Sequence, residues 1–171
     1  MDMIPFVHEG LGNSSYLAGI GDGEAILVDP DRTARRYVRV AEERGLRIAA
    51  VFETHVHADF ITGAVELIEA TDAQVFHSHD AGVNYRHQVA RPGEGVRLNG
   101  AEIEVIATPG HSPEHTSYVL HAAGAPPALF SGGAMTAGGA ARTDLVSAEM
   151  TEPLTHSTFR TLRDAFSHLP D

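Results

Sequence analysis

One segment of the chain limits the possible folds more than any other. An apolar run, Arg47–Glu53, leads directly into Thr54-His55-Val56-His57-Ala58-Asp59. A helical pattern follows over Ile61–Ala70, where apolar residues recur three and four positions apart. A strand that passes through a short loop into a helix is typical of α/β and α+β folds. The loop would then lie at the edge of a sheet, beyond the carboxyl end of its strand.

Two histidines occupy alternate positions in this loop. His55 and His57 would project to the same side of an extended backbone, so both imidazoles can reach one cation. Imidazole is largely neutral near pH 7 and suits Zn, Fe, Cu or Ni. Asp59 is close enough to serve as a ligand, a partner of a ligand, or a general base. Alternatively, Asp59 caps the following helix and the histidines lie on a surface loop. For a lone His-x-His we would favour that alternative.

A second histidine segment favours a metal site. Thr108-Pro109-Gly110-His111 follows another apolar strand, and the Pro-Gly turn would present His111. Three neutral ligands with an open position form a common catalytic metal site. We therefore expect His55, His57 and His111 to bind one metal ion. For His115, four residues further on, we expect a structural hydrogen-bonding role.

The rest of the pattern predicts alternating short strands and helices in one domain over residues 1–171. The strongest turn signal is Asn99-Gly100, which predicts a hairpin between Val96–Leu98 and Glu102–Ala107. Asp29-Pro30 ends the apolar strand Ala25–Val28. Further predicted strands are Ser15–Gly19, Gln74–His77, Thr116–His121 and Leu129–Ser131. Predicted helices cover 33–44, a weak pattern at Asp80–Val89, and Leu154–Leu169 with a stripe of Phe159, Leu162, Phe166 and Leu169.

Composition excludes several classes of function. The chain has 12 basic residues, all Arg, against 23 acidic ones, and a formal net charge of −11. Nucleic acids and anionic membranes require clustered positive charge, so we expect neither as a partner. Without Cys there is no thiolate site or disulfide. The N-terminus does not resemble a signal peptide, and no apolar run approaches the ~20 residues that span a bilayer, so we expect a cytoplasmic protein.

These motifs resemble the metallo-β-lactamase superfamily, in its persulfide dioxygenase and hydroxyacylglutathione hydrolase (glyoxalase II) branch. The resemblance rests on the two histidine segments and runs from about Asn13 to the end of the chain. Leu129-Phe130-Ser131-Gly132 and Ala141-Arg142-Thr143-Asp144 are similar to stretches of persulfide dioxygenases. The resemblance implies a four-layer αβ/βα sandwich that lacks its C-terminal elements. It also raises the alternative that the chain is a fragment of a longer protein.

The chain departs from the family pattern at two ligand positions. Phe60 replaces the last motif His, and Gly133 replaces an Asp that ligates or bridges metals. The resemblance therefore implies a mononuclear site for one divalent ion, Fe(II) or Zn(II), with Asp59 as the catalytic residue. The leading function is oxidation of a low-molecular-weight thiol persulfide by O₂ to sulfite. The alternatives are hydrolysis of a thioester and a degenerate domain that binds without catalysis.

The remaining candidates are weaker. Arg142 could bind an anionic group of the substrate through two parallel hydrogen bonds, or it could pair internally with Asp144. His77-Ser78-His79-Asp80 could line the pocket, but we do not expect it to bind metal. Exposed sheet edges leave a homodimer as one arrangement of the chain.

Overall fold

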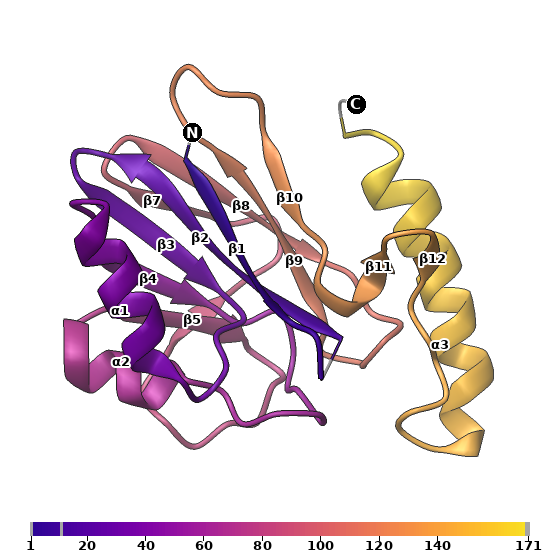
Figure 1. Ribbon diagram of the computed structural model, residues 1–171. Helices are drawn as coiled ribbons and strands as arrows, with labels where there is room; N and C mark the ends of the chain where they lie inside the picture. Colours follow the sequence, from indigo (N-terminus) through magenta and orange to yellow (C-terminus); the bar gives the residue numbers. More distant parts are fainter. Residues whose placement is uncertain (1, 11, 170–171) are drawn as a thin grey trace.

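The computed structural model describes residues 2–10 and 12–169, and its larger sheet has six strands in the order β1-β2-β3-β4-β5-β6 (Figure 1). The strands are β1 (Met3–His8), β2 (Asn13–Gly21), β3 (Glu24–Val28), β4 (Arg47–Phe52), β5 (Gln74–Ser78) and β6 (Gln88–Ala90). The first three strands pair antiparallel, and β3 to β6 are parallel. Parallel strands need crossovers. α1 (Ala34–Glu43) connects β3 to β4, and α2 (Ala64–Thr71) connects β4 to β5.

The second sheet is antiparallel, in the order β10-β9-β8-β7. Its strands are β7 (Gly95–Leu98), β8 (Ala101–Ala107), β9 (Thr116–His121) and β10 (Ala128–Phe130). The predicted hairpin between β7 and β8 is confirmed, with positive φ angles of 43° at Asn99 and 84° at Gly100. A short hairpin of β11 (Met135–Thr136) and β12 (Gly139–Ala140) follows the second sheet.

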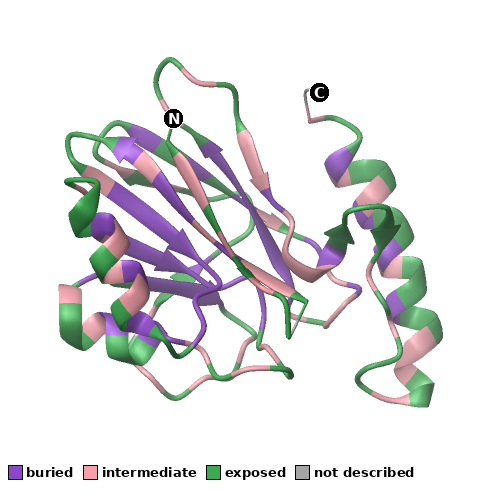
Figure 2. Ribbon diagram, in the orientation of Figure 1, coloured by how far each residue is buried: buried purple, intermediate pink, exposed green. Residues whose placement is uncertain are grey.

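Two hydrophobic clusters hold these layers together (Figure 2). One fills the space between the sheets, where Phe52 stacks on Phe76 at 4.8 Å and meets the edge of Tyr118 at 5.0 Å. The other lies between the larger sheet and its helices, around Tyr37 of α1 and Leu67 of α2. Because β4 contributes to both clusters, its carboxyl end is held firmly where the histidine loop begins.

The C-terminal helix lies apart from the helices that cover the larger sheet (Figure 1). It consists of α3 (Ala148–Arg160) and a π-helical continuation, η2 (Thr161–Phe166). The hydroxyl of Thr161 donates to the carbonyl oxygen of Pro109 at 3.2 Å. Gly110 faces Thr158 so closely that an added Cβ would lie 3.1 Å from its Cα. The helix therefore contacts the turn that precedes His111.

Some predicted elements were wrong in position or kind. Residues 80–87 contain no helix, and Gln88–Ala90 forms the edge strand β6. The last helix begins at Ala148, six residues before the predicted Leu154, because the side chain of Ser147 caps it by accepting from the amide of Met150. Its predicted apolar stripe is also wrong at Phe159, which is 61% exposed. The mixed α/β class itself is confirmed.

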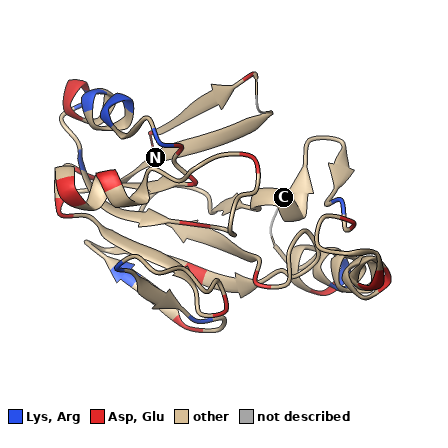
Figure 3. Cartoon of the chain, turned by 90° about the horizontal axis from the view of Figure 1, so that it is seen from below, with Lys and Arg blue, Asp and Glu red and all other residues tan. Residues whose placement is uncertain are grey.

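Acidic and basic positions are interspersed in the view from below, and neither sign gathers on one side of it (Figure 3). Arginines of α1 lie close to acidic residues of the same helix, as in the i,i+4 pair of Arg39 with Glu43. Among the described residues, no helix is long and apolar enough to cross a membrane.

Candidate metal centre

The two histidine segments meet at the carboxyl ends of β4 and β8. The amide of Thr116 donates to the carbonyl oxygen of Thr54 at 2.8 Å. The amide of Val56 donates to Oε1 of Glu114 at 3.1 Å. These hydrogen bonds join loops more than 50 residues apart in the chain, and they hold His55 and His57 beside His111.

The three predicted ligands lie close together. The ring centre of His55 is 4.0 Å from that of His57 and 4.7 Å from that of His111. Nδ1 of His55 shares a hydrogen bond of 2.8 Å with the hydroxyl of Thr54, which leaves its Nε2 available. Nδ1 of His111 is buried without a protein hydrogen-bond partner. The ring of His55 therefore lies beside both of the other predicted ligands.

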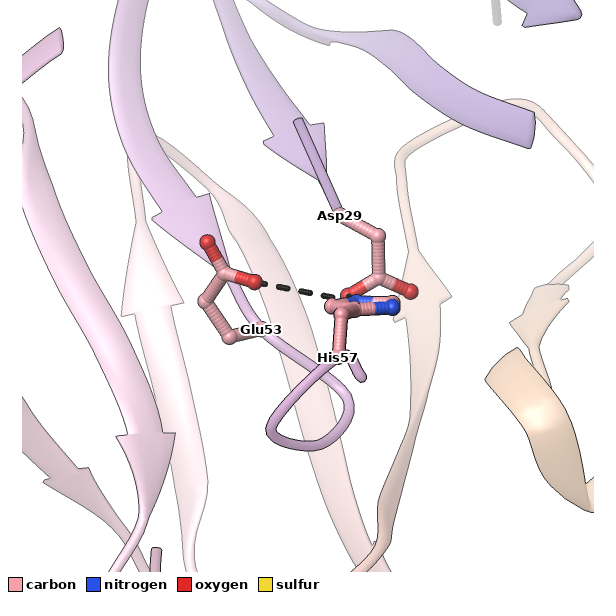
Figure 4. Close-up of side chains that lie close together, drawn as sticks. All are labelled: Asp29, Glu53 and His57. Carbon is pink, nitrogen blue, oxygen red and sulfur yellow. Dashed lines mark ion pairs between the residues drawn. The ribbon is translucent and has the colours of Figure 1, made fainter. Parts of the chain in front are cut away.

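Two buried carboxylates flank the ring of His57 on the side of Nε2 (Figure 4). Nε2 lies 3.2 Å from Oδ1 of Asp29 and 3.9 Å from Oε2 of Glu53. Metal-binding histidines commonly direct their second nitrogen toward a carboxylate. This arrangement leaves Nδ1 of His57 for a metal, and Oδ1 of Asp59 lies 3.9 Å from that nitrogen.

Sequence reasoning did not identify Asp29 and Glu53 as site residues. Both follow apolar strands, as the histidines do, but Asp29 was interpreted only as the end of a strand and Glu53 as the last residue of another. Charged residues at the ends of buried parallel strands were the signal that could have found them, because such ends meet at one edge of a sheet.

Burial and charge keep the histidines in distinct protonation states. Burial, aided by the nearby His57, lowers the pKa of His55 to about 2, so this ring is neutral. Burial also lowers the pKa of His111. At His57, burial opposes protonation, but the charges of Asp29 and Glu53 outweigh it and raise the pKa. A cation placed among the rings would displace that proton, since a metal ligand must be deprotonated.

The pKa values of the two carboxyl groups are shifted in opposite directions. Burial and, after it, the charge of Asp29 raise the pKa of Glu53 to about 8. Burial also opposes ionisation of Asp29, but His57 and hydrogen bonds lower the pKa of that group to about 2. Only one of two adjacent buried carboxyl groups is ionised, because two neighbouring negative charges are unfavourable at low dielectric.

Gly133 explains how the site accommodates the missing carboxylate. A Cβ at this position would lie 2.6 Å from Cγ of His111, so the imidazole occupies the space next to the glycine. The amide of Gly133 donates to Nε2 of His115 at 3.0 Å, and Nδ1 of His115 pairs with the hydroxyl of Thr108 at 2.8 Å. Because both nitrogens of His115 have partners, this histidine holds the turn in place, which is the structural role expected for it.

The other predicted residues lie around this centre. Phe60 packs against the ring of His57 with centres 4.1 Å apart. Asp59 is half exposed and lines a cavity of about 280 Å³ with Phe60 and Arg32. Arg142 forms two hydrogen bonds of 2.9 and 3.0 Å with Asp144, and it is exposed. His77 is buried at the end of β5 with its Nδ1 accepting from the amide of Ser78.

Two sets of residues could bind a cation. In one set, Asp29, Glu53 and His57, the candidate ligand atoms lie within 4.8 Å of one another, and no other group among the described residues is as close. In the other set, His55, His57 and His111, the ring centre of His55 lies 4.0 and 4.7 Å from those of the other two histidines. In the first of these sets, Asp29 already accepts from the amide and hydroxyl of Thr54 at 2.7 and 2.8 Å. Its carboxylate is therefore committed to holding the loop. The three-histidine set keeps its nitrogens available and fits a soft or borderline divalent metal better.

Comparisons with known proteins identify the family of the chain. The family model described as the metallo-beta-lactamase superfamily matches residues 8–171. A hydroxyacylglutathione hydrolase of Synechococcus sp. (strain WH7803) is 34% identical over 126 residues, which are 70% of this chain and 49% of that protein. The chain spans about half the length of this relative, so the activity of the whole protein is a matter for proposal.

Two solved structures superpose on the whole chain. A metallo-beta-lactamase from Staphylococcus aureus subsp. aureus COL has a TM-score of 0.88 at 31% identity, and the match covers 53% of that chain. ETHE1 from Myxococcus xanthus has a TM-score of 0.84 at 30% identity, with 72% of that chain covered. The fold type and the branch that the motifs predicted are thereby confirmed.

Proposed function

Because the chain belongs to the metallo-β-lactamase superfamily, in the branch of hydroxyacylglutathione hydrolases and persulfide dioxygenases, we propose that it is a mononuclear metalloenzyme that oxidises a thiol persulfide. The substrate is a low-molecular-weight persulfide. The persulfide, O₂ and water give the thiol, hydrogensulfite and one proton. The outer sulfur is oxidised, O₂ is reduced, and the bond between the two sulfur atoms breaks.

The observation that carries this proposal is that the ring of His55 lies beside those of His57 and His111, while two motif positions for a second metal lack a donor side chain. Phe60 packs on His57, and the ring of His111 fills the space next to Gly133. Both positions that would serve a second metal therefore hold no donor side chain. One metal held by these three histidines would leave open positions at which sulfur and O₂ could be brought together.

The residues of the site have separate roles in this proposal. His55, His57 and His111 would hold the metal, and when bound an Fe(II) ion supplies the electron-transfer chemistry that O₂ requires. Asp29 orients His57 through the contact at Nε2. Asp59, next to Nδ1 of His57 and half exposed, is placed to accept or return the proton of the persulfide. Arg142 would bind an anionic carrier only by releasing Asp144.

Thioester hydrolysis is the second candidate, and the match to hydroxyacylglutathione hydrolases favours it. The same three imidazoles would bind Zn(II), and Asp59 would orient the attacking water. The two candidates differ in the metal required and in the use of O₂. Cleavage of a thioester consumes water alone, whereas oxidation of a persulfide consumes one O₂ for each sulfite formed.

The first experiment is metal analysis of anaerobically purified protein beside its His111→Ala variant. We expect close to one iron per chain in the protein and loss of that iron in the variant, with O₂ uptake that depends on added persulfide. One zinc per chain, with thioester cleavage and no O₂ uptake, would select the hydrolase. If the protein binds neither metal and His55→Ala leaves its stability unchanged, the chain is a binding domain without metal-dependent catalysis.

A further inference from the structure

The loop between β4 and α2 carries His55, His57 and Asp59, and a buried carboxylate holds its entry. Asp29 accepts from the amide of Thr54 at 2.7 Å and from the hydroxyl of Thr54 at 2.8 Å. The start of the loop is therefore fixed to the end of β3.

A second buried carboxylate holds the exit of the loop. Glu53 is 1% exposed, and its Oε1 accepts a hydrogen bond from the hydroxyl of Thr62. The same hydroxyl accepts from the amide of Ala64 at 3.0 Å, where α2 begins. One hydroxyl thus connects the end of β4 with the first turn of the helix that follows the loop.

The exit is also packed tightly against the turn after β3. Thr62 pairs with Asp31 as an isolated β-bridge, and the amide of Gly63 donates to the carbonyl oxygen of Pro30 at 2.8 Å. A Cβ on Gly63 would lie 3.1 Å from the carbonyl carbon of Asp31. The exit of the loop is therefore held by backbone contacts with the turn after β3 and by the side-chain hydrogen bond from Thr62 to Glu53.

The other oxygen of Glu53 faces the middle of the loop. Oε2 lies 3.9 Å from Nε2 of His57, and the backbone oxygen of Glu53 accepts from the hydroxyl of Tyr118 at 2.8 Å. The remaining inward positions of β4 are apolar, and Phe52 is fully buried. A carboxyl group buried beside apolar residues is unfavourable unless its oxygens have partners. Here each carboxyl oxygen of Glu53 faces a residue of the loop between β4 and α2.

We infer that Glu53 is a positioning residue that fixes both the exit of the loop and the ring of His57, so that Nε2 stays turned toward the carboxyl groups and Nδ1 is left for a metal. This inference rests on the proposed three-histidine site. Glu53 acts through Thr62 and His57 and does not touch the metal or the substrate. Its contact with Thr62 is the part that variants can separate from metal binding itself.

Metal affinity measured by competition with a chromophoric chelator tests this role, with Zn(II) for affinity and Co(II) absorption for ligand geometry. Glu53→Ala and Thr62→Val each remove one side of the contact, and we expect about tenfold weaker binding or more for each. Glu53→Gln keeps an oxygen that can accept from Thr62, so its affinity and Co(II) spectrum should match those of the unsubstituted protein. The double variant should bind no more weakly than Glu53→Ala.

Hydrogen exchange of the metal-free protein provides a readout that does not depend on metal. Amides of residues 55–63 should exchange faster in Glu53→Ala and Thr62→Val but not in Glu53→Gln. Glu24→Ala is the matched control, because Glu24 is also a largely buried glutamate, paired with Arg47 at the opposite end of the sheet. It should leave exchange in this loop unchanged.

Two results would overturn the inference. If Glu53→Gln loses metal as strongly as Glu53→Ala while Thr62→Val binds normally, Glu53 is itself a ligand, as part of the set with Asp29 and His57. If exchange in the loop is no faster in Glu53→Ala and Thr62→Val than in Glu24→Ala, Glu53 does not position the loop. Failure of the unsubstituted protein to bind metal would instead reject the three-histidine site, and exchange would still decide the role of Glu53.

Discussion

At the scale of single residues, the candidate site depends on the absence of a side chain at Gly133. Gly133 stands where the family pattern has an Asp, and the imidazole of His111 fills the space that a side chain would need. The neighbouring Gly132 is equally constrained, since it has a φ of 51° and lies against Thr54 and His115. The Gly-Gly pair therefore lets both histidines pack against the turn, and it explains why the carboxylate could not simply be restored.

We predict that Gly133→Ala and Gly133→Asp both weaken metal binding, because a Cβ at 2.6 Å from Cγ of His111 forces that ring to rotate. The loss should be visible as lower metal content per chain and a changed Co(II) spectrum. Gly19→Ala serves as the control, since its added Cβ meets only ordinary contacts at 3.7 Å or more. Tighter metal binding by Gly133→Asp would mean that His111 can turn aside and that the new carboxylate becomes a ligand.

At the scale of elements, the site links the two sheets and the C-terminal helix. β4 and β8 deliver the histidine loops, and the turn at Pro109-Gly110 contacts η2 and α3. Gly110 has a φ of 153° and faces Thr158 across this contact. The helix and His111 therefore share one turn, although the helix contributes no ligand to the three-histidine set.

We predict that Gly110→Ala loosens α3 and His111 together. The new methyl group would lie 3.1 Å from Cα and Cβ of Thr158, in a backbone conformation that disfavours a side chain. We expect the free energy of unfolding to fall by about 2 kcal/mol or more. Chemical denaturation gives that value, and hydrogen exchange reports residues 148–160. If hydrogen exchange rises in α3 while metal affinity stays constant, the turn does not couple α3 to His111.

At the scale of the whole molecule, two cores support one site. Phe52 belongs to the cluster between the sheets, and Leu67 to the cluster beneath the helices. β4 faces both clusters, so neither can be lost without disturbing the strand that leads into the histidine loop. The molecule should therefore unfold as one cooperative unit.

We predict that Phe52→Ala lowers the free energy of unfolding by about 3–5 kcal/mol and Leu67→Ala by about 2–5 kcal/mol. Both variants should still show a single urea transition with an unchanged slope, followed in parallel by fluorescence and circular dichroism. Val65→Ala is the control, because Val65 is 44% exposed on α2. Two separate transitions in either core variant would show that the clusters unfold independently.

The sequence by itself determined the elements whose signals are local. The hairpin at Asn99-Gly100 follows from the backbone angles that those residues adopt. The position of the histidine loops at strand ends follows from apolar runs directly beside them. By contrast, the weak pattern at 80–89 gave a helix that is absent, because tertiary pairing draws Gln88–Ala90 onto β5 as an edge strand.

Only the tertiary structure decided what surrounds the histidines. Asp29, Glu53 and His57 come from the ends of two strands and a loop, and their contact depends on the parallel pairing of β3 with β4. The fit of Gly133 against His111 joins the segment before β9 to the segment after β10. Local patterns carry no information on such distances, because burial and packing between separate segments set them. The candidate ligands could thus be named from the sequence, whereas the carboxylates and the glycine beside them became visible only in the fold.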